Sequence, residues 1–468
     1  MCIKENNVKH PVLNKGKIPI GLGLLLLLFA PATASAGNIS IEIKETSLEL
    51  RPGLSTSVWA YNGLVPGMPI VAVPGERMVI KVTNRLDTPT NIHWHGLNVP
   101  NDQDGPAVLI NPGTTFTYDF VVPESGTYWY HSHQRPVLEQ MDMGLYGAFI
   151  VKDPTDSKYS GDHTFILDDW FLGANGERLP GTARGMMERL GNVESVNGKT
   201  GSAIEPLAFK QGELHKLRFV NASTAAVHTL KIKGHQFRVT HTDGHALSEP
   251  YTTDTIVLSP GERIDAEVSA TGSSGKSYEI LSDTPRLGIR IPVVYTTGKI
   301  KTVSSPFAPP ASRAFPGIFD KTPDHVLVLN SGMGSPGSGG GMMNGMSGMM
   351  GGSNAGMGMV WTINGKSFPD TDPISVKVGQ IVKLRFKNND TGMMHPMDHP
   401  IHIHGTYFQI VSIDGEMPDR ETWKDTVSVP AGKFVDIAFV MQNPGEWMLH
   451  CHIIDHEDNG MMTMVIAR

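Results

Sequence analysis

Histidines at alternate positions are the first feature of this sequence that could do chemistry. Four His-x-His pairs occur, two in the first third of the chain and two near its end: His93/His95, His131/His133, His402/His404 and His450/His452. On a strand, residues i and i+2 project from the same face, so each pair would offer two imidazoles to one point in space. The four pairs therefore predict a metal site built from both parts of the chain.

A single cysteine stands in the middle of the last pair and predicts a second site. Cys451 must point to the opposite face of the strand from its two histidine neighbours. Its available partners are His399, His456 and Met461, and two His, one Cys and a weak axial Met make the ligand set of a blue-copper electron-transfer centre. The eight paired imidazoles could then bind three further coppers, and four coppers could store the four electrons that turn dioxygen into water.

The elements that must position these residues repeat three times. A Gly-led turn, an alternating strand, an Asn-containing turn and a His-containing strand recur in VPGERMVIKVTNRLDTPTNIHWHG, KQGELHKLRFVNASTAAVHTLKIKGH and KVGQIVKLRFKNNDTGMMHPMDHPIHIHG. A second block, PGTTFTYDFVVPESGTYWYHSH, matches AGKFVDIAFVMQNPGEWMLHCH, with PGERIDAEV as its middle counterpart. With 51 Gly and 33 Pro to supply turns, the pattern predicts an all-β chain of three Greek-key β-sandwich domains.

Linker-like segments place the domain boundaries near residues 155 and 310. We expect domain 1 over 37–155, domain 2 over 156–310 and domain 3 over 311–468. Domain 2 contains histidines but neither a His-x-His pair nor a cysteine. We therefore expect it to be a spacer of the same fold without copper ligands. Domain 3 carries a Met-rich insert over 333–359, whose composition fits either capture of Cu(I) by thioether sulfur or a flexible linker.

Residues 1–36 have the three parts of a secretory signal peptide. Four lysines precede an apolar run over 18–29, and Ala34-Ser35-Ala36 offers a cleavage site. The run is short for a transmembrane anchor, so we expect export to the periplasm or cell exterior, by the general route because no twin arginine is present, without stable membrane insertion after cleavage. Cleavage would also remove Cys2, so the mature chain could form no intrachain disulfide. The net charge of −7 leaves no basic footprint for nucleic acid.

Four strings carry a resemblance to a known family over essentially the whole mature chain: IHWHGLNVP, HPIHIHGTYFQI, WKDTVSVPAG and HCHIIDHEDNGMM. At these residues the sequence resembles the multicopper oxidases, most closely the bacterial copper-tolerance branch of laccase-like cuprous oxidases. The resemblance implies three cupredoxin domains and four copper ions, with a type 1 copper in domain 3 and a trinuclear cluster between domains 1 and 3. It assigns His399, Cys451, His456 and axial Met461 to type 1, His93 and His402 to type 2, and His95, His131, His133, His404, His450 and His452 to the type 3 pair.

Three acids could assist such chemistry. Asp104 and Glu457 match positions that serve the oxygen chemistry of this family, where an acid could supply or relay the protons that dioxygen reduction consumes. The alternative is a solvated turn Asp and a surface Glu. Asp425 could orient a ligand imidazole, or could have only a structural role in its turn.

Sulfur near the type 1 ligands bears on the substrate. The resemblance places a Met-rich insert at this point in cuprous oxidases, and Met393, Met394 and Met397 precede His399, which favours Cu(I) as the reductant. The sequence departs from the family pattern in having His395 where an acid is expected, and Asp398 could substitute for it in the substrate-copper site. Three hypotheses follow: an exported cuprous oxidase that protects the envelope from copper, a laccase acting mainly on phenols or aromatic amines, and a copper-free cupredoxin-fold binding protein.

Overall fold

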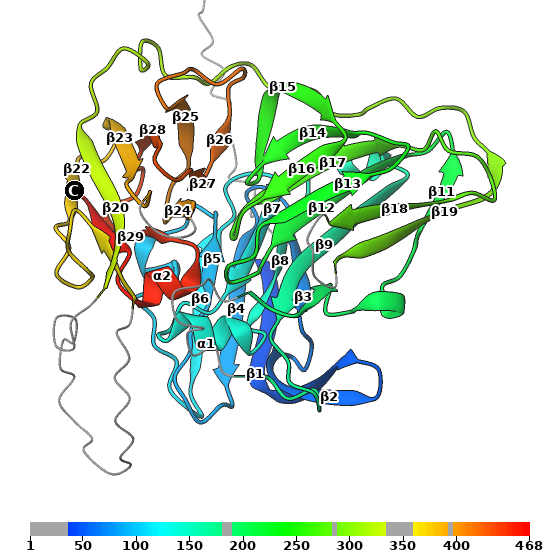
Figure 1. Cartoon of the computed structure of the whole chain (residues 1–468), viewed down its shortest axis with the longest axis horizontal. Coiled ribbons are helices and arrows are strands. Elements are labelled where there is room, and N and C mark those ends of the chain that lie inside the picture. The colour runs from blue at the N-terminus through cyan, green and yellow to red at the C-terminus, as the bar shows by residue number, and fades with distance from the viewer. Residues whose placement is uncertain (1–35, 180–189, 283–287, 334–358, 392–395) are drawn as a thin grey trace, which may run out of the picture. The chain divides into compact units, whose positions relative to one another are not determined.

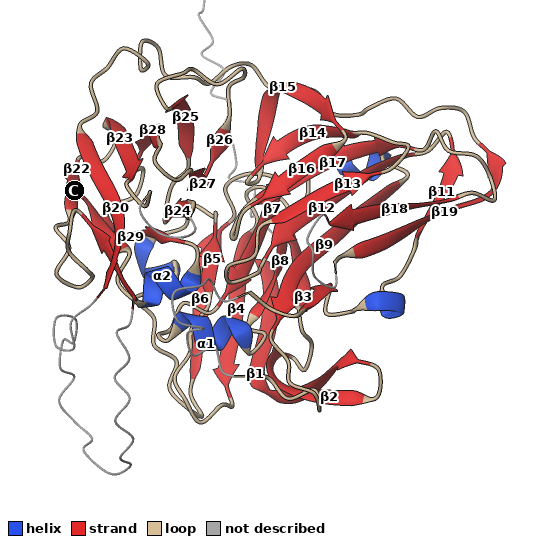
Figure 2. Ribbon diagram, viewed as in Figure 1, coloured by secondary structure: helices blue, strands red, loops and turns tan. Residues whose placement is uncertain are grey.

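Nearly every regular element of the computed structural model is a β-strand, as Figure 1 and Figure 2 show. The structure describes residues 36–179, 190–282, 288–333, 359–391 and 396–468. The predicted signal peptide, apart from Ala36, therefore lies outside the described residues. So do Met393, Met394 and all of the Met-rich insert except its two ends.

The strands form three units, each made of two sheets. The first unit contains β1 (Ala36–Arg51), β2 (Leu54–Tyr61), β3 (Gly67–Ala72), β4 (Arg77–Asn84), β5 (His93–His95), β6 (Thr115–Val121), β7 (Gly126–His131) and β8 (Tyr146–Val151). The middle unit contains β9 (Gly161–Trp170), β10 (Val193–Val196), β11 (Leu207–Gln211), β12 (Leu214–Asn221), β13 (His228–Ile232), β14 (Phe237–Thr242), β15 (His245–Thr253), β16 (Thr255–Leu258), β17 (Arg263–Ser269), β18 (Ser277–Ser282) and β19 (Arg290–Lys299). The third unit contains β20 (His325–Met333), β21 (Met359–Ile363), β22 (Ile374–Val376), β23 (Ile381–Asn388), β24 (His399–Ile403), β25 (Phe408–Ile413), β26 (Trp423–Lys424), β27 (Thr426–Val429), β28 (Phe434–Val440), β29 (Gly445–Cys451) and β30 (Met462–Ala467). Two short α-helices, α1 (Val137–Asp142) and α2 (Ile454–Asp458), and three 3₁₀ turns, η1 (Asn101–Gln103), η2 (Asp156–Lys158) and η3 (Gly201–Ala203), complete the described elements.

The three units share a common core topology, although the described strands of the first unit include no counterpart of β14, β15 and β16 of the middle unit. Their sheets have the orders β2-β1-β4-β6 with β3-β8-β7-β5, β10-β9-β12-β17-β14-β15 with β11-β19-β18-β13-β16, and β21-β20-β23-β28-β25-β26 with β22-β30-β29-β24-β27. In every unit the first strand of one sheet runs parallel to a later strand, as β1 does to β4, β9 to β12 and β20 to β23. A parallel neighbour requires a crossover, which here passes through the opposite sheet in all three units. The prediction of an all-β chain of three β-sandwiches is confirmed.

The Asn at the end of each repeated strand explains why the sequence repeat gives a structural repeat. Asn84, Asn221 and Asn388 are buried at the ends of β4, β12 and β23. In each case the side-chain amide donates to two backbone carbonyls of loops at that end of the sandwich, and its oxygen accepts the backbone N–H two residues further on. These bonds fix the loop that leads into β5, β13 or β24, the His-containing strand of each repeat.

Apolar side chains from both sheets fill the interior of each unit, so each is a packed sandwich. A fourth apolar cluster joins the first and middle units through large residues such as Trp129, Tyr146 and Trp170, and it also takes in Ile454 of α2. Helix α2 lies beside α1, as Figure 1 shows, and the carboxylate of Asp458 accepts the first backbone N–H groups of α1. The first and third units therefore meet where the sequence places its histidine pairs.

Candidate metal centre

Neighbouring strand ends bring the four His-x-His pairs together. In the first unit β5 pairs with β7, which sets His93 opposite His131, and in the third unit β24 pairs with β29, which sets His402 opposite His450. The two units meet so closely that imidazoles from each stack on one another: His93 lies on His404 with ring centroids 3.9 Å apart, and His95 on His402 at 3.8 Å. All eight side chains are buried. We call these eight residues the histidine cluster.

The two imidazoles of each pair are neighbours in the structure. Only the first pair lies wholly on a strand, whereas the second member of each other pair lies just beyond its strand end. The ring centroids within a pair are 4.9 to 5.8 Å apart. Three imidazoles from three different pairs, His133, His404 and His450, bring their ligand atoms within 4.8 Å of one another. Both members of a pair also occur together in two such groups, His93 with His95 and His131, and His402 with His404 and His93, so ligand atoms gather within pairs as well as between them.

Unpaired ring nitrogens indicate what the cluster is built to hold. Among the described residues, no hydrogen-bond partner is found for one ring nitrogen each of His93, His95, His131 and His402, or for either nitrogen of His452. Buried polar atoms are normally paired, so several unpaired acceptors in one place point to a missing electrophile. Imidazoles without a nearby sulfur suit copper or zinc rather than calcium or magnesium. The donor set fits the coppers that the sequence predicts.

In three of these histidines, the other ring nitrogen bonds to a backbone carbonyl oxygen. His93 Nδ1 lies 2.9 Å from the carbonyl oxygen of Asp104, and His131 Nδ1 lies 2.9 Å from that of Ser132. His402 Nδ1 bonds at 2.9 Å to the carbonyl oxygen of Asp425. Such bonds select the ring tautomer and aim the free nitrogen inward.

Burial keeps most of the cluster neutral. Burial, reinforced by the neighbouring imidazoles, holds the pKa of His131, His133, His404 and His452 well below the ordinary value. Neutral imidazole is the form that binds a metal ion. His450 differs: burial alone would lower its pKa, but the carboxylate of Glu457 raises it above the ordinary value.

Asp104 and Glu457 are both buried, so neither is the solvated side chain of the alternative interpretation. Asp104 follows η1, and its Oδ2 accepts from His404 Nδ1 at 2.8 Å. Glu457 lies on α2 with Oε2 3.1 Å from His450 Nδ1 and Oε1 3.6 Å from His133 Nε2. Each acid therefore touches ligand imidazoles and lies where a proton could be held beside the cluster.

The cysteine lies on the other side of the same strand end. Cys451 Sγ is 3.8 Å from His399 Nδ1 and 3.5 Å from His456 Nδ1, and all three residues are buried. Met461 is also fully buried, and its backbone bonds to both neighbours: its N–H donates to the carbonyl of His456 and its carbonyl accepts from Cys451 N–H. We call His399, Cys451, His456 and Met461 the cysteine centre. Its sulfur and nitrogen donors fit copper.

Two residues that shape the cysteine centre escaped the sequence analysis. The carboxylate of Asp390 accepts from His399 Nε2 at 2.7 Å, which leaves Nδ1 to face Cys451. The indole of Trp361 stacks on His456 with ring centroids 3.6 Å apart. Asp390 could have been suspected from its place two residues after the repeated Asn, but nothing near Trp361 in the sequence marks it.

The predicted substrate-copper residues fall in different environments. Met393 and Met394 lie outside the described residues. Met397 packs in the core of the third unit, whereas Asp398 is exposed and accepts the backbone N–H of Ala431 at 2.9 Å. The acid that contacts His399 is therefore Asp390 and not Asp398.

The middle unit contributes contacts but no group of ligands. Four of its histidines, His228, His235, His241 and His245, are buried, and none belongs to a potential metal group among the described residues. Asp425 of the third unit accepts from His95 Nε2 at 3.1 Å, which favours the orienting role over a purely structural one.

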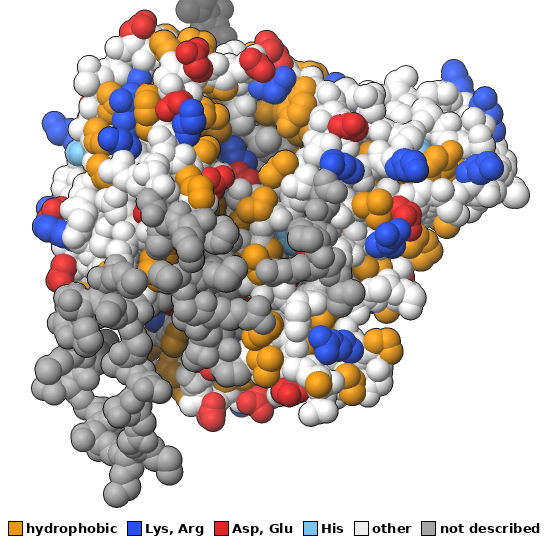
Figure 3. Space-filling view, viewed as in Figure 1, with side chains coloured by type: hydrophobic (Ala, Val, Ile, Leu, Met, Phe, Trp, Pro, Cys, Tyr) orange, Lys and Arg blue, Asp and Glu red, His pale blue; other side chains and the backbone are white. Residues whose placement is uncertain are grey.

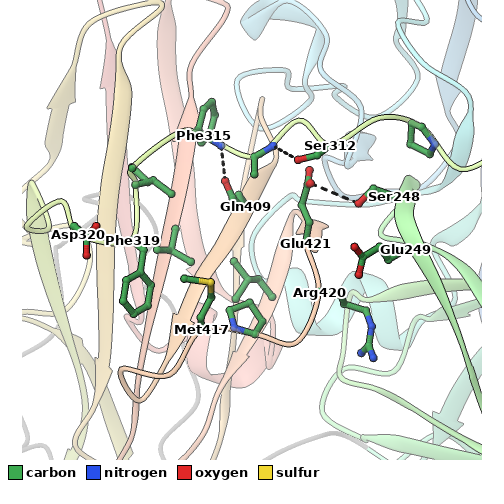
Figure 4. A pocket seen from close by; sticks show the side chains of 17 residues that line it. Ser248, Glu249, Ser312, Phe315, Phe319, Asp320, Gln409, Met417, Arg420 and Glu421 are labelled. Carbon is green, nitrogen blue, oxygen red and sulfur yellow. Dashed lines mark hydrogen bonds between the residues drawn. The ribbon is translucent and has the colours of Figure 1, made fainter.

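The surface outside the two centres is less specific. A cavity of about 830 Å³ lies where the segment before β20 crosses β25, with Phe315, Gln409 and Met417 among its lining (Figure 4). It shares no residue with the histidine cluster or the cysteine centre. On the face drawn in Figure 3, basic and acidic side chains of the described residues are interspersed. Within the described part of the chain, no helix is long and apolar enough to cross a membrane.

Comparisons with known proteins agree with this geometry. The family description "Multicopper oxidase" matches residues 42–156, 161–297 and 345–468. The chain is 32% identical over 444 residues to the multicopper oxidase MmcO of Mycobacterium tuberculosis, covering 88% of this chain and 83% of that protein. It is 28% identical to a laccase of Trametes maxima, covering 87% and 89% of the two chains.

Solved structures give the same result. The fold resembles the crystal structure titled "Multicopper oxidase from Campylobacter jejuni: a metallo-oxidase", with a TM-score of 0.74, 27% identity and coverage of 92% and 91%. The three sandwiches are thus cupredoxin-like. The chain belongs to the multicopper oxidases, copper-containing oxidoreductases that couple oxidation of a reducing substrate to reduction of dioxygen.

Proposed function

We propose that this chain is an exported multicopper oxidase that oxidises Cu(I), and also phenols or aromatic amines, and so protects the cell envelope from copper. The family supplies the oxidation coupled to dioxygen. The proposal adds three points to what the family shows: the Cu(I) substrate, the location outside the cytoplasm and the number of coppers. The observation that carries the proposal is the end of β29, where Cys451 faces one centre while His450 and His452 face the other.

The residues divide into four copper positions. We assign type 1 to the cysteine centre, type 2 to His93 and His402, and the type 3 pair to two triads: His133, His404 and His450, and His95, His131 and His452. The ring centroids of the second triad are 5.0 to 5.7 Å apart, which supports the division. When bound, the coppers would supply one-electron oxidation at the cysteine centre and four-electron reduction of dioxygen to water at the cluster.

The acids of the site serve the proton side of this reaction. Reduction of dioxygen to water consumes protons, and the cluster itself is closed to bulk water by the burial of all its ligands. Glu457 can hold a proton on its carboxylate between His450 and His133. Asp104, bonded to His404, orients that ligand and offers a second proton site.

Sulfur supports Cu(I) as the substrate. The sequence places eight Met in residues 333–359, and thioether sulfur is a soft donor that prefers Cu(I) to hard cations. The relative from Campylobacter jejuni is described as a metallo-oxidase. The second candidate is a general laccase, favoured by the relative from Trametes maxima. The copper-free binding protein has no support, because the chain retains both donor sets.

The hairpin at the base of the insert allows a clean test. Met333 and Met359 are partners in the antiparallel pair β20–β21, so a two-residue Asn-Gly turn can replace residues 334–358 without changing the strand register. We expect this deletion to weaken turnover at low Cu(I) concentrations and to leave phenol oxidation unchanged or increased.

A second variant separates the sulfur atoms from the length of the segment. It keeps the length but replaces six methionines of the insert by leucine: Met342, Met343, Met346, Met349, Met350 and Met357. It should weaken turnover at low Cu(I) concentrations as the deletion does. Unchanged Cu(I) kinetics in both variants would favour the laccase.

Export is tested separately. Cell fractionation should recover the protein outside the cytoplasm, with its amino terminus at Gly37 after cleavage behind Ala36. An uncleaved cytoplasmic protein would overturn this part of the proposal.

A further inference from the structure

A buried arginine of the middle unit binds the third unit beside the histidine cluster. Arg263, the first residue of β17, donates from Nη1 to Asp425 Oδ1 at 2.7 Å and from Nη2 to Asp425 Oδ2 at 2.6 Å. Both side chains are completely buried. Two parallel bonds of this kind fix the plane of the carboxylate as well as its position.

The remaining donors of Arg263 are also used. Nε donates to the carbonyl of Thr127 in the first unit, and the two Nη atoms donate to the carbonyls of Asp243 and Gly261 in the middle unit. With the two bonds to Asp425, all five N–H groups of the guanidinium have an acceptor. One side chain therefore bonds to all three units.

Asp425, held in place by Arg263, accepts hydrogen bonds from two imidazoles of the histidine cluster. Its Oδ1 accepts from His95 Nε2 at 3.1 Å, and its backbone carbonyl accepts from His402 Nδ1 at 2.9 Å. Within the described residues, the opposite nitrogens, His95 Nδ1 and His402 Nε2, have no hydrogen-bond partner. The two rings stack with an interplanar angle of 15°. Under the proposed assignment, they belong to different coppers, one type 3 and one type 2.

The middle unit also holds the backbone on which Asp425 lies. The carboxylate of Asp243 accepts the backbone N–H groups of Asp425 and Thr426, both at 3.2 Å. Lys424 Nζ lies 3.1 Å from the carboxylates of both Asp243 and Glu262. The position of Asp425 is therefore set by side chains from the middle unit.

The turn after His95 fits against the same pair. Gly96 has φ of +87°, and a Cβ built there would overlap Arg263 Nη2 and Asp425 Oδ2. The backbone of the first unit therefore packs against the arginine and the carboxylate without room for a side chain at residue 96.

From these contacts we infer that Arg263 is a positioning residue of the dioxygen-reducing site, acting through Asp425 on His95 and His402. The inference rests on the ligand assignment in the proposed function. Without Arg263 a buried carboxylate would lose its counter-charge and its fixed plane, so it would no longer hold His95 in one tautomer and orientation. If Arg263 has this role, the middle unit controls the reduction of dioxygen, although its described residues contribute no member to a potential metal group.

The test compares Arg263→Gln with Arg263→Lys in the copper-loaded full chain. In Arg263→Gln we expect reoxidation of the reduced protein by dioxygen to slow by about 10- to 100-fold, the range for lost outer partners of metal ligands. The EPR signature of the type 2 copper should change, and that copper should be lost more readily to a chelator. The visible band of the cysteine centre and its anaerobic reduction should be unchanged. Lysine should recover part of the effect, because it keeps the charge but not the two parallel bonds.

Arg218→Gln is the matched control. Arg218 is a middle-unit arginine 1% exposed, paired with Asp156, Asp162 and Asp265, and it touches no cluster histidine. We expect this control to unfold at a lower temperature with a normal type 2 signal. If Arg263→Gln behaves in the same way, its role is merely structural and the inference is wrong.

Three further outcomes are decisive. If Arg263→Gln does not fold, Asp425→Asn, which keeps the shape but removes the charge, must show the same altered type 2 signal, and a normal signal overturns the inference. A wild-type protein with no type 2 copper would overturn the ligand assignment and the inference together. A wild-type protein that ignores Cu(I) but reduces dioxygen with a phenol would overturn only the proposed substrate.

Discussion

The cysteine centre and the histidine cluster lie on opposite faces of one strand end but are built differently. All four residues of the cysteine centre come from the third unit, as do Trp361 and Asp390, which contact its two histidines. The cluster takes its imidazoles from the first and third units, and a side chain of the middle unit, Arg263, bonds to the carboxylate that contacts His95. One centre is therefore a property of a single sandwich, whereas the other exists only when all the sandwiches are packed together.

The largest effect should come from removing the thiolate. Cys451→Ser should abolish both the visible charge-transfer band and all oxidase activity, because no other described donor near His399 and His456 is a thiolate. Absorption spectra and oxygen consumption of the copper-loaded variant would check this. A colourless wild-type protein with full activity would show that the cysteine centre has been misassigned.

The next prediction separates the two centres. His402→Ala should reduce dioxygen consumption by more than about 100-fold, above the cost of losing an outer partner, yet leave a blue band that a reductant bleaches. The reason is that His402 faces the cluster while Cys451 faces away from it. Stopped-flow bleaching under nitrogen measures the first half of the reaction alone. If the blue band disappeared from a folded, copper-loaded variant, the two centres would not be independent.

A proton-transfer variant probes the cluster more gently. Glu457→Gln keeps the size of the side chain but can neither release nor accept a proton, so we expect reoxidation by dioxygen to slow by about 100-fold while copper content stays the same. Glu446→Gln, at an exposed position of β29, is the control and should react at the wild-type rate. Equal rates in both variants would remove Glu457 from the proton path.

The smallest effect tests the cysteine centre from its outer side. Asp390→Asn removes the negative partner of His399 Nε2, so the imidazole becomes a weaker donor and the potential of the blue centre should rise while its colour is retained. Asp398→Asn, one residue from His399 but bonded to Ala431, should leave the potential unchanged. A redox titration distinguishes the two. Equal potentials for Asp390→Asn and the wild type would mean that the carboxylate does not tune His399.

Local sequence signals were enough to predict the fold and the gathering of the paired histidines on the opposite face from Cys451. The repeated Asn84, Asn221 and Asn388 mark equivalent corners of the three sandwiches, and alternation around Cys451 separates two centres on one strand. These features could be predicted because each depends on residues close together in the chain.

Contacts between distant segments could not be predicted in the same way. Arg263 and Asp425 are 162 positions apart, and an arginine at the start of a strand is ordinary until the packing of the units brings an acid to it. The gathering of imidazoles from three different pairs, His133, His404 and His450, also depends on how the units pack. Asp390 was likewise not predicted as a partner of His399, because it lies nine positions away and a turn brings it to the ring.

The pairing of Met333 with Met359 has a consequence for how this enzyme can vary. Because the chain leaves and re-enters the sandwich at two register partners, the ends of the intervening segment are already held together by the hairpin. The entropy of closing a flexible loop grows only with the logarithm of its length, about 0.6 kcal/mol for each doubling. Segments of very different length and sulfur content can therefore be exchanged at this point at little cost in stability. Under the proposed role of the insert in Cu(I) capture, substrate preference can change in this way without disturbing the cysteine centre or the histidine cluster.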